Sequence, residues 1–363
     1  MVSRLLKDFR WGVLPVPGRF LAIVFFIFLF ILPLITASEY ILLLTTVAAI
    51  YAIFAVSWDL LSGYTGQVNF GHALFFGSGA FGAALLHKYL GLQPWVTIPL
   101  GALIATGIGV VTCFPALRLR PPYLSILTMA FPIILERIIR ALPAEVFGGD
   151  QGIRELPSLA SNPIVIKIPL IHAVVSVPTQ EYYICLIVMT VSVLIMWKLT
   201  DAGSRYIRTG LIFHAIREDE IAARATGINT IRYKILAFVI AGFFAGLAGA
   251  LFAHYYHLAH PSFFSTTTSF LAIIWVVFGG IVSIYGPVVG VYTLYVGVDY
   301  LRATPFYAYR ILIMTVIIIV ILLFMPEGIA VWIRDKIERE CPRCKLTNVA
   351  WRRECRACGA SLR

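Results

Sequence analysis

The chain has 363 residues, of which 60% are hydrophobic and only 13% are charged. A soluble domain averages about 45–50% apolar and about 25% charged residues, so this composition excludes a water-soluble fold that hides its apolar surface in its own core. The formal net charge is +11. Because basic residues flank the apolar segments, this charge indicates membrane topology and contact with anionic lipid, and it is poor evidence for a nucleic-acid partner.

The apolar segments are long enough to cross a bilayer, which takes about 20 residues of helix. They lack the alternation of barrel strands, so we expect an all-α polytopic membrane protein with about ten transmembrane helices. The first apolar run is longer than a signal-peptide core and is expected to be a retained helix. The ten expected spans are residues 20–37, 40–58, 68–88, 95–117, 122–140, 181–199, 234–256, 267–284, 287–301 and 309–326.

Lys and Arg gather in four segments: before the first span, after the fourth, between the sixth and seventh, and after Pro326. Ten spans place all four on one side, which predicts a multi-pass protein of the plasma (inner) membrane with both termini in the cytoplasm. Arg137 and Arg140 are the exceptions. The predicted organisation is a cytoplasmic segment (1–19), a transmembrane domain (20–330) that contains an outer loop (141–180) and a cytoplasmic segment (203–234), and a cytoplasmic tail (331–363).

A polar interruption lies between the second and third spans. Residues 62–82 read SGYTGQVNFGHALFFGSGAFG and contain six glycines. Gly77, Gly79 and Gly82 are expected to allow close helix packing. The earlier part is expected to be a broken or re-entrant element that lines a transport route, since irregular backbone at membrane depth needs protein or water around it. The candidate route residues are Gly63, Gly66, Gln67, Asn69, Gly71 and His72.

Two later segments also carry candidate sites. The outer loop contains several prolines and GGDQGI at 148–153, so turns and short irregular pieces are expected there. His254, His257 and His260 are spaced by three, but no carboxylate or cysteine accompanies them, and interfacial histidines are a better interpretation than a metal site.

The tail contains two C-x-x-C pairs, Cys341 with Cys344 and Cys355 with Cys358. Two such pairs at this spacing favour one tetrahedral Zn²⁺ held by four thiolates, because a reducing cytoplasm disfavours disulfides. The sequence therefore predicts a small structural zinc ribbon at the C-terminus, with free thiols in an unstructured tail as the alternative.

Several motifs in order along the chain resemble the LivM-type permeases of branched-chain amino-acid ABC transporters. The resemblance covers about residues 20–330 and rests on SGYTGQVNFGHALFFGSGAFG (62–82), RPPYLSILTMAF (120–131), GGDQGI (148–153), AIREDEIAARATGINTIRYKILAFVIAGFFAGLAGALFAHY (215–255), FGGIVSIYGPVVG (278–290) and LFMPEGI (323–329). It implies a non-enzymatic permease that works with a second homologous permease, two cytoplasmic ABC ATPases and an extracytoplasmic solute-binding protein. The implied cargo is a branched-chain or other hydrophobic amino acid.

The resemblance also implies roles for two groups of residues. Glu220, Ala222, Ala223 and Gly227 are similar to the EAA-type coupling loop that docks an ATPase, although Glu220 stands one place earlier than that pattern has it. Gly148, Gly149, Asp150 and Gly152 are candidate contacts for the binding protein. The chain has no G-x-x-x-x-G-K-S/T motif, so ATP is expected to bind to partner chains.

Three alternatives stay open at this stage. A urea or short-chain amide permease would have the same partners. An ion-coupled secondary transporter usually has carboxylates within its spans, whereas here Asp59, Glu136 and Asp299 all lie near span ends. A membrane enzyme is disfavoured because the chain has neither H-E-x-x-H nor G-x-S-x-G.

Overall fold

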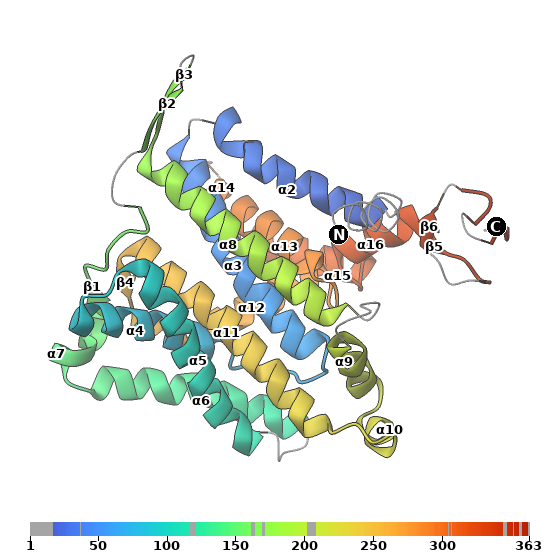
Figure 1. Ribbon diagram of the computed structural model, residues 1–363, viewed down its shortest axis with the longest axis horizontal. Coiled ribbons are helices and arrows are strands. Elements are labelled where there is room, and N and C mark those ends of the chain that lie inside the picture. Colours follow the sequence, from blue (N-terminus) through green and yellow to red (C-terminus); the bar gives the residue numbers. More distant parts are fainter. Residues whose placement is uncertain are drawn as a thin grey trace.

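The computed structural model is a bundle of helices with small sheets at its ends (Figure 1). It describes residues 17–36, 38–116, 121–160, 164–168, 171–201, 208–303, 305, 307–343, 347–350, 352–355 and 358–361. The long or apolar helices are α2 (Pro17–Ile35), α3 (Glu39–Trp58), α4 (Ala73–Leu90), α5 (Pro94–Ala116), α6 (Pro121–Ala141), α8 (Val177–Thr200), α11 (Thr230–Tyr256), α12 (Thr266–Gly279) and α15 (Arg310–Phe324).

Shorter elements connect these helices. They are the helices α7 (Ala144–Phe147), α9 (Thr209–Glu218), α10 (Glu220–Ala225), α13 (Tyr285–Val291), α14 (Gly297–Tyr300) and α16 (Ile329–Ile337), the π-helical turns η1 (Asp59–Gly63) and η4 (Tyr292–Val296), and the 3₁₀ turns η2 (Gly149–Gln151), η3 (Pro261–Phe264), η5 (Leu301–Ala303) and η6 (Tyr307–Tyr309). The strands are β1 (Ile153–Arg154), β2 (Ile164–Ile168), β3 (Ile171–Val175), β4 (Leu258–Ala259), β5 (Glu338–Glu340) and β6 (Thr347–Val349).

Each expected span coincides with helical structure, but two predictions were wrong in detail. The third span begins at Ala73, because residues 68–72 are irregular, and the ninth is built from α13, η4 and α14 in succession. Within the described residues, five helices are long and apolar enough to cross a membrane: Glu39–Gly63, Pro94–Pro115, Val177–Thr200, Thr230–Tyr256 and Arg310–Ile337. A polytopic helical fold is therefore confirmed, while the total of ten crossings stays a prediction.

The fold is not purely α-helical. Within the described part of the chain, three two-stranded antiparallel sheets pair β1 with β4, β2 with β3, and β5 with β6. The β2–β3 hairpin projects from the bundle beside the start of α8 (Figure 1), where only turns and irregular pieces were expected. The β1–β4 pair joins the outer loop to the end of α11, so a contact distant in sequence fixes that loop.

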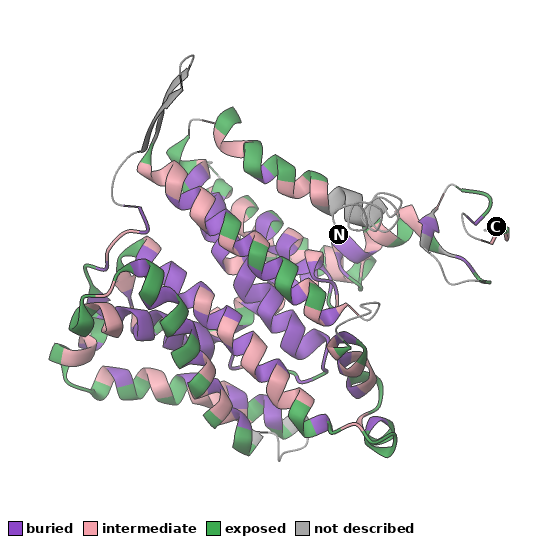
Figure 2. Ribbon diagram, viewed as in Figure 1, coloured by how far each residue is buried: buried purple, intermediate pink, exposed green. Residues whose placement is uncertain are grey.

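The centre of the bundle is α3, which is buried on all sides over most of its length (Figure 2). Its neighbours include α8, α11, α12 and α13. A second group, α4, α5 and α11, packs closely through glycines. A side chain at Gly79 of α4 would place its Cβ 2.0 Å from the carbonyl oxygen of Gly246 in α11. The expected packing role of Gly79 is therefore confirmed.

We expect Gly79→Ala to lower the free energy of unfolding by about 1–3 kcal/mol, because the added methyl forces α4 and α11 apart. The matched control is Gly107→Ala in α5, where nothing lies within 4 Å of the added Cβ. Thermal unfolding in detergent measures both. Equal midpoints for the two variants would contradict the glycine-packed contact.

The two ends of the bundle carry different elements (Figure 1). The short helices α9 and α10, α16 and the C-terminal strands lie at one end, whereas α7, β1 and β4 lie at the other. The basic segment between α8 and α11 and the tail thus share an end. Which end faces the cytoplasm stays a prediction.

Candidate functional site

The polar interruption is an irregular segment, residues 64–72, that connects η1 to α4. Its hydrogen bonds are mostly internal or to the neighbouring helices α3 and α6. The Ser57 hydroxyl and His72 Nε2 are 2.8 Å apart, the Trp58 indole donates to the Asn69 carbonyl at 2.7 Å, and the Asn69 side-chain oxygen accepts from the Gly71 N–H at 2.8 Å. This network fixes one conformation of a glycine-rich segment.

The segment also packs directly on α6. The Phe70 N–H donates to the Thr128 hydroxyl, the Ser125 hydroxyl donates to the Val68 carbonyl, and a Cβ at Gly71 would lie 1.8 Å from the Thr128 carbonyl oxygen. Glycine is therefore required at position 71 by the close approach of two backbones.

The structure brings the six candidate route residues together, but it buries most of them. Gly63, Gln67, Asn69, Gly71 and His72 are buried, and only Gly66 is exposed. The Gln67 side-chain oxygen is buried without a hydrogen-bond partner. In the single chain, these polar groups therefore face the interior of the protein and not an open channel.

Gly66 and Tyr64 connect this segment to the basic end of the bundle. Gly66 adopts φ +71° and lies against Arg217 of α9, with 3.5 Å between the position of an added Cβ and Arg217 Cγ. The Tyr64 ring packs edge-on against the His214 ring at 5.4 Å. Movement of α9 would therefore be transmitted to the irregular segment by direct contact.

Sequence reasoning missed the role of Asp59, which it treated only as a carboxylate near a span end. Asp59 is fully buried in η1, and its two carboxylate oxygens accept hydrogen bonds from the N–H groups of Val282 at 2.9 Å and Ser283 at 3.2 Å. These donors belong to the turn between α12 and α13, where Gly280 has φ +122° and Val282 has φ +61°. Asp59 thus ties the glycine-rich interruption after α3 to the turn between α12 and α13.

The coupling segment forms the two short helices α9 and α10. Asp219 caps α10, since its side chain accepts from the N–H groups of Ile221 at 2.8 Å and Ala222 at 3.0 Å. Gly227 has φ +88° with nothing within 4 Å of an added Cβ, so glycine is needed there for its backbone conformation alone. Residues 203–207 of the predicted cytoplasmic segment lie outside the described residues.

Glu220 clamps α10 onto α11. Its carboxylate contacts Arg224 at 2.5 Å and Lys234 at 2.7 Å and accepts from the Thr230 hydroxyl at 3.2 Å. Partial burial opposes ionisation, but the hydrogen bonds from Lys234 and Arg224 outweigh it and hold the pKa of the Glu220 carboxyl below its ordinary value. The clamp is therefore complete above the ordinary carboxyl pKa and is lost as the pH falls through the lowered one.

The four predicted coupling residues do not share one exposed surface. Ala223 is buried and Glu220 points into the clamp, whereas Ala222 and Gly227 are exposed. The most prominent apolar side chain of α10 is Ile221, which is 80% exposed and which sequence reasoning did not select. A β-branched apolar residue two positions after a capping Asp was the available signal.

The GGDQGI motif at 148–153 forms a compact turn at the opposite end. Gly148 and Gly152 have φ +78° and +71°, and a Cβ at Gly152 would lie 2.2 Å from the Ala259 carbonyl oxygen. Asp150 pairs with Arg140, and its side chain is 78% exposed. Arg140 also pairs with Glu136 at 2.9 Å, four residues earlier on α6. The glycines therefore hold the turn against β4, and Asp150 is its exposed charge.

The three histidines at and just after the end of α11 have separate partners. His254 contacts the Thr97 hydroxyl at 2.7 Å, His257 contacts the Leu156 carbonyl at 2.8 Å, and His260 contacts the Ser262 hydroxyl at 2.7 Å. They do not form a metal-ligand cluster among the described residues. Their role is to fasten the outer loop and η3 to the end of α11.

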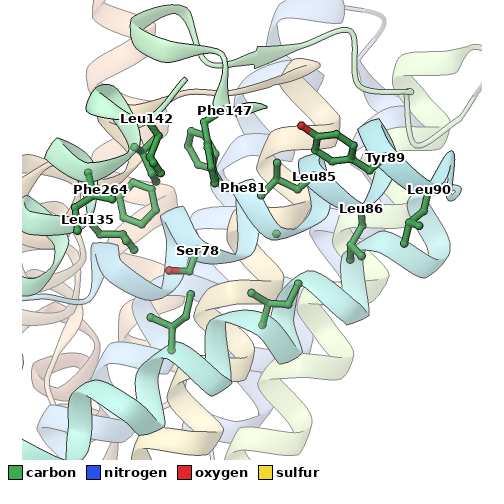
Figure 3. Close-up of a pocket in the computed structure, with 15 residues that line it drawn as sticks. Ser78, Phe81, Leu85, Leu86, Tyr89, Leu90, Leu135, Leu142, Phe147 and Phe264 are labelled. Atoms are coloured by element: carbon green, nitrogen blue, oxygen red, sulfur yellow. The ribbon is translucent and has the colours of Figure 1, made fainter. Parts of the chain in front are cut away.

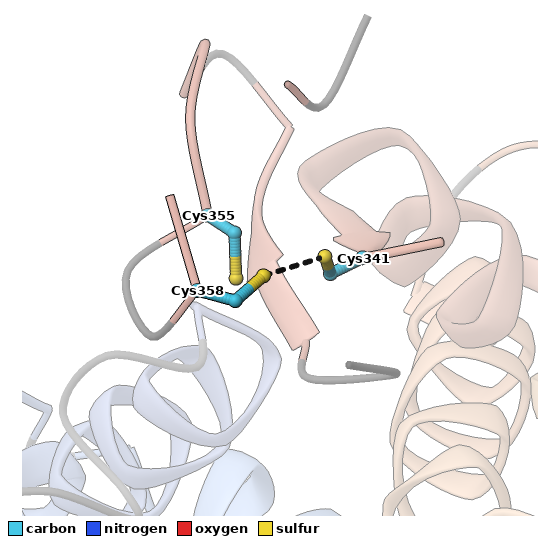
Figure 4. A group of neighbouring side chains, drawn as sticks. All are labelled: Cys341, Cys355 and Cys358. Atoms are coloured by element: carbon cyan, nitrogen blue, oxygen red, sulfur yellow. Dashed lines mark hydrogen bonds between the residues drawn. The ribbon is translucent and has the colours of Figure 1, made fainter. Parts of the chain in front are cut away.

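The cysteines of the tail do converge (Figure 4). The sulfur atoms of Cys341, Cys355 and Cys358 all lie within 4.8 Å of one another, and Cys341 and Cys358 are 3.5 Å apart. Tetrahedral zinc with Zn–S bonds of about 2.3 Å places its sulfurs roughly 3.8 Å apart, so this donor set fits a zinc ion. Cys344, the fourth predicted ligand, lies outside the described residues.

A large apolar pocket of about 480 Å³ lies between α4, α5, α6 and η3 (Figure 3). Its lining is aromatic and aliphatic apart from the hydroxyls of Ser78 and Tyr89, and the Ser78 hydroxyl is buried without a hydrogen-bond partner. A zwitterion placed there would leave both of its charges unpaired in a low dielectric, which is strongly unfavourable. The pocket suits an acyl chain and not an amino acid.

Comparison with known proteins agrees with this architecture. The profile of the branched-chain amino acid transport system permease component matches residues 40–322. The high-affinity branched-chain amino acid permease LivM of Escherichia coli is 29% identical over 325 residues, covering 85% of this chain and 72% of that protein. LivM of Salmonella typhimurium is 28% identical over 320 residues, covering 83% and 72%.

A permease with a different name is also similar. BraD of Pseudomonas aeruginosa is 25% identical over 307 residues, covering 78% of this chain and 92% of that protein. No solved structure matches the chain. Because the family profile spans most of the 363 residues, the chain belongs to the family of branched-chain amino acid transport system permease components.

Proposed function

We propose that this chain is the transmembrane subunit of an ATP-driven importer that moves branched-chain or other hydrophobic amino acids across the plasma membrane. Family membership and the branched-chain amino acid transport of the LivM and BraD relatives support this cargo. The chain is a transport component and not an enzyme. ATP hydrolysis belongs to two cytoplasmic ATPases, a second homologous permease completes the path, and an extracytoplasmic binding protein delivers the substrate.

The observation that carries the proposal is α10. This short helix is capped by Asp219, clamped to α11 by Glu220, and presents Ile221 outward at the basic end of the bundle. A rigid helix with one exposed apolar anchor is suited to a groove on a partner. Through α9 it contacts Gly66 and Tyr64, which offers a route from the ATPase to the interior of the membrane domain.

The test is purification of the native complex in mild detergent, followed by ATP hydrolysis assays with leucine, isoleucine, valine and urea in the presence of binding protein. We expect ATPases to co-purify and a loaded binding protein to stimulate them. Ile221→Glu should weaken ATPase association at least about tenfold, because it replaces an interface anchor by a charge. Ile221→Leu retains the apolar surface and should bind like the unchanged chain.

Two outcomes would redirect the proposal. A chain that purifies alone and carries solute on an ion gradient would support the secondary-transporter alternative. Stimulation by urea or a short amide, with no response to amino acids, would leave the importer intact and change its cargo.

Two further assignments belong to this proposal. The segment that contains Gly63, Gly66, Gln67, Asn69, Gly71 and His72 forms part of the wall of the route and shifts with α9. The turn that contains Gly148, Gly149, Asp150 and Gly152 contacts the binding protein, for which the exposed charge of Asp150 is the main anchor.

The last part of the proposal is that the C-terminal tail forms a structural zinc site. Cys341, Cys344, Cys355 and Cys358 would bind one Zn²⁺ as thiolates, and the metal would supply folding energy to a module with almost no core of its own. Asn348 supports this assignment, since its side-chain amide donates to the Cys355 sulfur at 3.6 Å, as is typical of groups around a metal thiolate.

A further inference from the structure

An aromatic cluster with one ion pair lies between α3, α11 and the η4–α14 segment. The ring of Tyr51 is 5.3 Å from that of Tyr295, 4.9 Å from Trp275 and 5.4 Å from Phe252. The rings of Phe252 and Tyr256 are 4.6 Å apart. Side chains distant in the sequence thus form one continuous aromatic surface.

Polar groups of this cluster lead to Asp299. The Tyr295 hydroxyl interacts with the Asp299 carboxylate and with the Tyr256 hydroxyl, and the Tyr295 ring packs against that of Tyr51. Asp299 pairs with Arg302 at 2.7 Å. The hydroxyl of Tyr40, at the start of α3, donates to the Asp299 carbonyl at 2.9 Å and anchors the end of α14.

The two partners of the ion pair differ in exposure, and this difference determines which of them a ligand can displace. The Asp299 side chain is only 8% exposed, whereas that of Arg302 is 57% exposed. Tyr256 is also exposed and Tyr51 is half-buried, although the residues around Tyr51 on α3 are buried. The guanidinium can therefore move away while the carboxylate stays fixed at the edge of the aromatic cluster, where the Tyr256 side chain is exposed.

We propose that Tyr51, Tyr256, Tyr295, Asp299 and Arg302 form a binding site for a zwitterionic aliphatic amino acid on its way into the route. The substrate ammonium replaces Arg302 at the Asp299 carboxylate, and the freed guanidinium binds the substrate carboxylate. One ion pair is exchanged for two, so no charge is left unpaired. The faces of Tyr51 and Tyr256 take the ammonium by cation–π attraction and the branched side chain by apolar contact.

This inference rests on the proposed function and narrows its cargo. Urea and short amides carry neither an ammonium nor a carboxylate, so they gain nothing from separating Asp299 and Arg302. The apolar pocket of Figure 3 contains neither charge. Among these two places, only the aromatic cluster matches a substrate with both an ammonium and a carboxylate.

The test is ATP-driven uptake of labelled leucine by proteoliposomes that contain the complete complex, with saturating binding protein. We expect Asp299→Asn to reduce the uptake rate at least tenfold, and Tyr295→Phe, which removes one hydroxyl, to reduce it about three- to tenfold. The matched control is Glu136→Gln, which alters the i,i+4 ion pair with Arg140 instead. It should stay within twofold of the unchanged complex.

The outcomes separate this inference from the function on which it rests. No amino-acid uptake by the unchanged complex would refute the proposed function. Normal uptake by the unchanged complex and by both Asp299→Asn and Tyr295→Phe would refute only the binding site. If the Asp299→Asn complex does not assemble, uptake by the Tyr295→Phe complex tests the binding site. Stimulation of its ATP hydrolysis by the binding protein shows that the Tyr295→Phe complex is intact.

Discussion

Replacing Asp59 by alanine is expected to lower the free energy of unfolding by about 2–6 kcal/mol and to abolish transport. The substitution leaves the N–H groups of Val282 and Ser283 without their acceptor, and each such group costs about 1–3 kcal/mol. It also releases the turn in which Val282, a β-branched residue, is held at φ +61°. Thermal unfolding in detergent and uptake by proteoliposomes measure the two effects.

Asp59→Asn keeps the shape and one acceptor oxygen, so its loss of stability should lie between those of the alanine variant and the unchanged chain. Glu136→Gln is the control, since a partly exposed ion pair contributes no more than about 1 kcal/mol. If Asp59→Ala unfolds at the same temperature as the unchanged chain, the carboxylate does not hold the α12–α13 turn.

The second large effect concerns the tail. We expect the intact protein to contain one zinc per chain and Cys355→Ala to contain almost none, as measured by elemental mass spectrometry. Structural zinc sites contribute about 10–16 kcal/mol of apparent binding free energy, so the tail should unfold without the metal. Trypsin should then cleave at Arg339, Arg343, Arg352 or Arg353, while the helical bundle stays intact.

Cys185→Ala is the matched control, because Cys185 is buried within α8 and lies outside the cysteine cluster. It should retain its zinc and its resistance to trypsin. A metal-free protein whose tail resists trypsin with or without a chelator would contradict the zinc assignment.

A series of direct contacts runs from one end of the bundle to its centre. Helix α10 is held by Glu220, α9 contacts Gly66 and Tyr64, and Asp59 in the adjacent η1 ties the α12–α13 turn. Each link is a direct contact between packed groups. A shift at α10 therefore has a physical path to the irregular segment of residues 64–72 and to the α12–α13 turn.

The sequence predicted the positions of the helices well, because a run of apolar residues must be helical in lipid and its length is set by the bilayer. It was less accurate where the chain departs from that rule. The start of the third span and the composite ninth span were misjudged, since whether a glycine-rich stretch stays helical depends on its neighbours. The β2–β3 hairpin was missed because the outer loop was interpreted only through its prolines and glycines.

By itself, the sequence determined the membrane character of the chain, the order of its helices, the family resemblance, and the cysteine pairs of the tail. All of these depend on composition, run length or spacing along the chain. Only the tertiary structure decided that Asp59 holds Val282 and Ser283, that Ile221 and not Ala223 is exposed, and that Tyr51 packs against Tyr295. Such pairs are hundreds of residues apart or differ by two positions around a helix, so they are set by how the helices pack and not by any local pattern.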